Sequence, residues 1–125
     1  MARTNLPYTQ LAPNRHNADP AGTTIDATLV TNGVVINAAD FERTLLRVRN
    51  TAGSSKTVTV RAGDSSAAWM AAQGDLAAPV AADNGETFLG PFTSARFQQA
   101  GGKLHVDFQS GTTGTITALK LPHLM

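Results

Sequence analysis

The residues that come nearest to a catalytic motif are Gly63-Asp64-Ser65, because a Gly-Asp-Ser triplet surrounds the nucleophile in two unrelated groups of hydrolases. A serine nucleophile needs a base and a third group that orients the base. The sequence offers only His105 and Asp107, which are predicted to share one face of a strand. Ser66-Ala67 follows the triplet, where trypsin-like enzymes carry Gly-Gly. Since Gly, Asp and Ser are also favoured turn residues, we predict a turn here and no enzyme.

The sequence predicts no metal or cofactor site. The chain has no cysteine, and His16, His105 and His123 lack the spacing typical of zinc ligands. The stretch 83–86, Asp-Asn-Gly-Glu, offers carboxylate and amide oxygens but not the full ligand series of a calcium loop. A plain turn is the favoured interpretation of these four residues.

Three arginines, Arg47, Arg49 and Arg61, are predicted to lie together on one exposed face of a central hairpin. They form either a solvated face paired with acidic residues or an ionic contact to an acidic protein surface. A nucleic-acid site would carry aromatic residues between the basic ones, and here the residues interleaved with the arginines on that face are Leu45, Thr57 and Thr59. The formal net charge of +1 also argues against nucleic acid and membrane surfaces as partners.

Alternating apolar and polar residues predict two strands, 44–50 and 56–62, joined by the loop 51–55. A hairpin with Asn50 opposite Lys56 places the apolar side chains of both strands on one face and the polar ones on the other. Across the whole chain, the residues predicted to face inward are Leu46, Val48, Val58, Val60, Phe97, Leu104, Val106 and Phe108.

Further short strands are expected at regular spacing. They cover residues 25–29, 34–36, 86–92, 95–99, 103–108 and 115–121, with turns at Asn32-Gly33 and Gly101-Gly102. The resulting fold class is all-β, an antiparallel β-sandwich or jelly-roll-like barrel of about seven or eight strands. With 125 residues, we predict one such domain over residues 23–125.

Residues 1–22 are predicted to form an extended arm, because Pro7, Pro13 and Pro20 interrupt them. The arm is either a loose tail or a segment that docks on a neighbouring subunit through Leu6, Tyr8 and Leu11. The Ala-rich stretch 66–73 predicts one or two helical turns that carry Trp69 and Met70. These two side chains would suit subunit packing, and an exposed Trp69 would suit stacking on a sugar.

Three stretches resemble a group of small structural proteins of tailed bacteriophages, encoded near the major capsid gene of siphophages. They are Leu45–Arg61, Phe88–Phe108 and Gly114–Leu119. The resemblance implies a capsid decoration (cement) protein, a β-sandwich on the outer surface of the virion. It also implies two partners. One is the major capsid protein, and the other is the chain itself, which would assemble as a homotrimer. Production in the cytoplasm of a bacterial host agrees with the lack of cysteine.

Two other functions remain open. A β-sandwich can serve as a glycan-binding module on a tail or fibre, which would require Trp69 and Tyr8 to be exposed. The chain can also be a head–tail connector or tail subunit, present in a ring of low copy number. No signal peptide is recognisable at the N-terminus, and no apolar stretch is long enough to cross a membrane.

Overall fold

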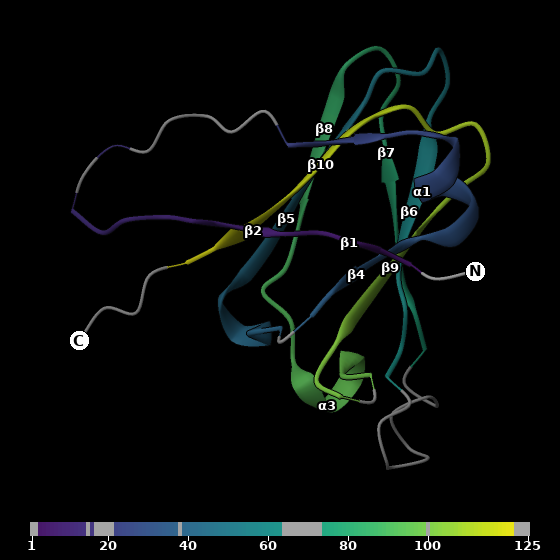
Figure 1. The fold of residues 1–125 in the computed structure, drawn as a ribbon. Helices are drawn as coiled ribbons and strands as arrows, with labels where there is room; N and C mark the ends of the chain where they lie inside the picture. The colour runs from purple at the N-terminus through teal and green to yellow at the C-terminus, as the bar shows by residue number, and fades with distance from the viewer. Residues whose placement is uncertain are drawn as a thin grey trace.

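The computed structural model of the chain describes residues 3–14, 16, 22–37, 39–63, 74–99 and 101–121. The described residues form ten strands in two facing sheets, which confirms the all-β class (Figure 1). The first sheet has the order β1 (Thr4–Asn5), β4 (Val34–Ile36), β9 (Leu104–Phe108), β6 (Lys56–Val60) and β7 (Leu76–Val80). The second has the order β2 (Tyr8–Gln10), β10 (Gly114–Lys120), β5 (Thr44–Asn50) and β8 (Gly85–Leu89), and β3 (Thr23–Ile25) also pairs with β10.

The sheets are mixed rather than purely antiparallel. β1 pairs with β4 and β2 pairs with β10 in parallel, whereas the remaining pairs of described strands are antiparallel. Among the described strands no pair joins the two sheets, so the architecture resembles a sandwich and a closed barrel is not observed. The expected seven or eight strands were too few because the strands at residues 4–10 and 76–80 were not predicted.

One apolar cluster fills the space between the two sheets. All eight residues predicted to face inward belong to it, and none exposes more than 8% of its surface. The alternation of apolar and polar residues therefore predicted the faces of β5, β6 and β9 correctly.

The predicted pairing of residues 44–50 with 56–62 is wrong. β5 lies in the second sheet between β10 and β8, while β6 lies in the first sheet between β9 and β7. The connecting loop crosses from one sheet to the other, and the fully buried Asn50 holds it in place. The Asn50 amide nitrogen donates to the carbonyl oxygens of Ser54 (2.9 Å) and Val80 (3.1 Å), and its oxygen accepts from the Ala52 N–H (3.0 Å).

Helical structure replaces the predicted turn at Asn32-Gly33 and parts of the predicted strands 25–29 and 95–99, whereas the predicted turn at Gly101-Gly102 is observed. Asn32-Gly33 ends helix α1 (Ala27–Asn32) instead of turning a hairpin, and Asp26 caps the first turn of α1 through the Leu29 N–H. Gly33 has a φ of 78°, a value that hairpin turns and helix ends both require. The Asn-Gly dipeptide alone therefore does not show whether a hairpin turn or a helix end is formed. Residues 95–99 hold the short helix α3 (Ser94–Phe97) and a bridge from Gln99 to Lys103.

The N-terminal segment, defined here as residues 3–11, belongs to the sandwich and is not a separate arm. It forms an edge strand in each sheet, β1 and then β2, so the boundary predicted at residue 22 is not observed (Figure 1). Between these strands, Leu6 is 2% exposed and packs in the core. Pro7 lies between the two strands, at the point where the segment passes from one sheet to the other, and so interrupts neither of them.

Candidate binding surfaces

A row of four charged side chains crosses the outer face of the first sheet. We call Arg3, Asp107, Arg61 and Asp75 the charged row. Asp107 points outward because its neighbours on β9, Val106 and Phe108, point into the core. Its two oxygens contact Arg3 Nη1 at 2.6 Å and Arg61 Nε at 3.4 Å, and Arg61 Nη1 lies 3.2 Å from Asp75 Oδ2. The charges therefore alternate and compensate one another across the sheet.

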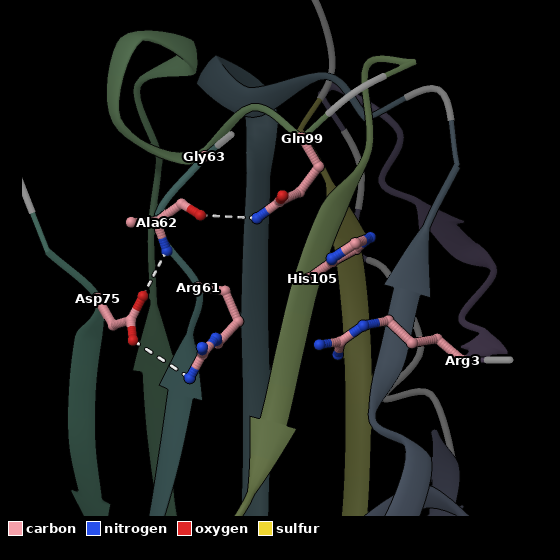
Figure 2. Close-up of a pocket in the computed structure, with 7 residues that line it drawn as sticks. All are labelled: Arg3, Arg61, Ala62, Gly63, Asp75, Gln99 and His105. Carbon is pink, nitrogen blue, oxygen red and sulfur yellow. Dashed lines mark hydrogen bonds and ion pairs between the residues drawn. The ribbon is translucent and has the colours of Figure 1, made fainter. Parts of the chain in front are cut away.

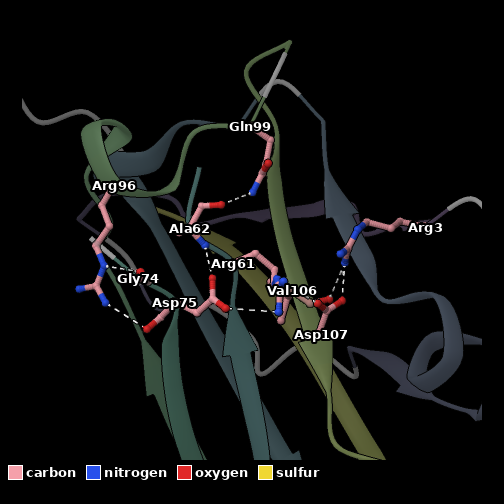
Figure 3. Close-up of polar contacts among 9 residues, drawn as sticks. All are labelled: Arg3, Arg61, Ala62, Gly74, Asp75, Arg96, Gln99, Val106 and Asp107. Atoms are coloured by element: carbon pink, nitrogen blue, oxygen red, sulfur yellow. Dashed lines mark hydrogen bonds and ion pairs between the residues drawn. The ribbon is translucent and has the colours of Figure 1, made fainter. Parts of the chain in front are cut away.

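Hydrogen bonds to the backbone fix both ends of the charged row (Figure 3). At one end, Arg3 Nη1 also donates to the Val106 carbonyl at 3.2 Å. At the other, Asp75 Oδ1 accepts from the Ala62 N–H at 2.6 Å, and Arg96 donates to the Asp75 carbonyl at 3.2 Å. These bonds tie the Arg3 side chain to the backbone of β9 and the Asp75 side chain to the backbone that follows β6.

A pocket of about 440 Å³ opens beside the charged row (Figure 2). Its lining residues are Arg3, Arg61, Ala62, Gly63, Asp75, Gln99 and His105. The buried Gln99 donates to the Ala62 carbonyl at 2.8 Å and so shapes the floor between β6 and the loop that leads to β9. A pocket of this size is large enough for a small polar ligand, and its fixed charges offer both donors and acceptors.

The residues of the hydrolase hypothesis lie only partly within the described residues. His105 and Asp107 share the outer face of β9, as predicted, but both oxygens of Asp107 contact arginines. Asp64 and Ser65 lie outside the described residues. No group of three or more metal-ligating side chains occurs in the part of the chain that the structure describes.

The outer face of the second sheet carries a different set of side chains. Arg49 of β5 binds Glu86 of β8, with Nε at 3.0 Å and Nη2 at 2.7 Å from the same carboxylate oxygen. Arg47 lies opposite Phe88 in the register of β5 and β8, and its Nη2 lies 3.4 Å from Thr117 Oγ1. Phe88 is 57% exposed, and among the described residues it is the only large apolar side chain with such exposure.

The three arginines predicted to cluster do not lie together. Arg47 and Arg49 share the outer face of the second sheet, whereas Arg61 belongs to the charged row on the first. The prediction was wrong because it placed strands 44–50 and 56–62 in one sheet.

The predicted contact residues of the N-terminal segment are largely occupied within the chain itself. Leu6 is buried in the core, so it has no surface to offer a partner. Tyr8 is half-buried, and its hydroxyl oxygen lies 2.6 Å from Thr44 Oγ1. The Tyr8 hydroxyl oxygen also accepts a hydrogen bond from the Asp40 N–H at 2.9 Å. Leu11 is half-buried, and its N–H donates to the Lys120 carbonyl at 3.0 Å. Trp69 and Met70 lie outside the described residues.

Sequence reasoning missed Arg3, Asp75 and Phe88. The partner of Arg3 lies 104 positions away, and no local pattern predicts such a distant ion pair. Phe88 stood in a predicted strand, and its alternation with the buried Leu89 could have indicated an exposed aromatic residue.

Comparison with protein-family models, with curated protein sequences and with solved structures finds no match for this chain. No helix in the described ranges has the length and apolar character needed to span a bilayer.

Proposed function

We propose that the chain is a structural protein of a tailed bacteriophage that binds the outer surface of the capsid and stabilises it. The partners in this proposal are the major capsid protein and further copies of the chain, assembled as a homotrimer on the capsid exterior. The proposal rests on the resemblance of Leu45–Arg61, Phe88–Phe108 and Gly114–Leu119 to small siphophage head proteins. An all-β fold with two polar outer faces is compatible with such a role.

The observation that carries the proposal is the exposed Phe88 on an edge strand. Aromatic residues and arginines are enriched where proteins meet, and they supply much of the binding energy there. Phe88 is 57% exposed and lies opposite Arg47, with the ion pair of Arg49 and Glu86 next to it. β5 is the only described strand that pairs with β8, and on its other side Thr87 Oγ1 of β8 donates to the Pro79 carbonyl of β7 at 3.4 Å. A capsid protein can therefore contact the exposed side chain of Phe88.

Stabilisation of a capsid by this surface does not require a high affinity at each site. A trimer engages three equivalent sites at once, so weak contacts multiply through the effective concentration. The face around Phe88 then acts as a clamp between adjacent capsid subunits.

Co-sedimentation with expanded empty capsids of the phage that encodes the chain tests the proposal. The wild-type protein should bind, and Phe88→Ser should weaken binding at least tenfold, which corresponds to about 1.4 kcal/mol. Ala77→Ser is the matched control, because Ala77 is exposed on β7 of the other sheet. A wild-type protein that does not bind mature capsids overturns the function, whereas binding that Phe88→Ser leaves unchanged overturns only the choice of surface.

A glycan-binding module on a tail or fibre is the second candidate, and the polar pocket beside the charged row favours it. The half-buried Tyr8, with its hydroxyl already hydrogen-bonded, speaks against the stacking role that this function would give it. Immunogold labelling separates the two candidates: label on the head supports capsid binding, and label on the tail supports the glycan module.

A further inference from the structure

The N-terminal segment contacts the rest of the chain in the way a bound peptide contacts a protein. Its backbone N–H groups at Thr4, Leu6 and Leu11 donate to the carbonyls of Gly33, Val35 and Lys120. Its side chains add the ion pair from Arg3 to Asp107 and the hydrogen bonds of Asn5 with Asn37 and of Tyr8 with Thr44. These partners lie 29 to 109 positions away along the chain.

The receiving surface is a groove between the edges of the two sheets. β4 forms one wall and β10 the other, and Leu6, 2% exposed, fills the space between them. Both pairings are parallel. A tight turn cannot join parallel neighbours, so the segment must arrive at the groove from a distant part of the chain. The N-terminal segment of another copy can make the same two parallel pairings.

We propose that the N-terminal segment of one copy can occupy the groove between β4 and β10 of a second copy, so that neighbouring copies exchange strands. This inference rests on the proposed function, since a virion surface holds many copies close together. Exchange preserves each of the contacts described above, so it costs little beyond the ordering of the connecting chain. A high local concentration then favours the exchanged form.

The length of the connecting chain permits exchange. Residues 12–22, which join the segment to β3, number eleven. Eleven extended residues reach about 36–40 Å, a distance comparable to the diameter of a small domain. Two copies that sit side by side are within this range.

Cross-linking of full-length variants tests the exchange, and the absence of cysteine makes the chain suited to it. Asn37 Nδ2 lies 2.8 Å from Asn5 Oδ1, and both residues are exposed. Asn5→Cys and Asn37→Cys are prepared as separate proteins, unfolded together in guanidinium, refolded as a mixture and treated with a short bis-maleimide. A mixture of Asn5→Cys with Ser54→Cys is the control, because Ser54 is exposed on the loop between β5 and β6.

Strand exchange predicts a covalent heterodimer of the Asn5→Cys and Asn37→Cys chains, in excess of the control mixture, with mass spectrometry locating the link between these two positions. The proposal is overturned if this mixture gives no more heterodimer than the control while the double variant Asn5→Cys/Asn37→Cys cross-links within single chains. This outcome overturns strand exchange alone and does not contradict the proposed binding to capsids. Conversely, exchange between copies that do not sediment with capsids would support this inference and contradict the proposed function.

Discussion

Arg3 and Asp107 lie 104 positions apart in the chain, yet Arg3 Nη1 is 2.6 Å from Asp107 Oδ1. The pair ties the N-terminal segment to β9 in the middle of the first sheet. From there the charged row continues through Arg61 to Asp75. The beginning of the described chain is thereby fixed to strands that come late in the sequence.

Replacing Arg3 should loosen β1 more than it destabilises the whole protein. Arg3→Gln removes the ion pair to Asp107, and we expect a loss of about 0.5–1 kcal/mol, because both side chains are partly exposed. Hydrogen exchange at the Leu6 N–H, which is bonded to the Val35 carbonyl, should become faster. Arg43→Gln is the matched control, since Arg43 forms a similarly exposed pair with the nearby Asp40. Equal effects of both variants on the Leu6 amide would contradict the role given to Arg3.

Leu6 should behave as a core residue although it lies near the N-terminus. Leu6→Ala should lower the free energy of unfolding by about 2–4 kcal/mol, because it leaves a cavity between the sheets. Leu11→Ala should have a smaller effect, since Leu11 is half-buried. Denaturant unfolding measures both variants, and similar midpoints would show that the N-terminal segment is not part of the sandwich.

The buried Asn50 should be required for the loop between β5 and β6. Asn50→Ala removes three hydrogen bonds and leaves the Val80 carbonyl without this donor, so we expect a loss of about 2–4 kcal/mol. Asn50→Asp keeps an oxygen for the Ala52 N–H but loses both donors. It should therefore also be destabilised, as thermal unfolding can measure. A neutral effect of both changes would mean that the loop is held by other contacts.

The two faces of β9 should respond differently to truncation. Val106 is fully buried, so Val106→Ala should cost about 1–3 kcal/mol. His105 lies on the outer face, and His105→Ala should cost much less. The reverse order of denaturant midpoints would show that the faces of β9 are assigned wrongly.

The sequence was informative about faces and much less so about strand partners. Val48 and Val58 are both fully buried, as their alternation predicted. That alternation is the same whether the two strands pair within one sheet or face each other across the core. The strand partners are fixed by contacts between distant residues, such as the bond from Asn50 to the Val80 carbonyl, which spans 30 positions. A pattern of neighbouring residues contains no such information.

The missed strand β7 has a similar explanation. It contains Pro79 and two alanines, a composition that disfavours a central strand. β7 lies at the edge of the first sheet, where proline is tolerated. The candidate surfaces were predictable only in part for the same reason: the partners of Arg61, for example, depend on how β6 is placed in the sheet.

The number of copies of the chain in each purified virion tests capsid decoration most directly. Quantitative mass spectrometry of intact particles, with the major capsid protein as the internal reference, gives this ratio. We predict an abundance close to that of the major capsid protein, since each equivalent capsid site binds one copy. Absence from the particle, or the few copies of a connector or tail ring, would contradict the account.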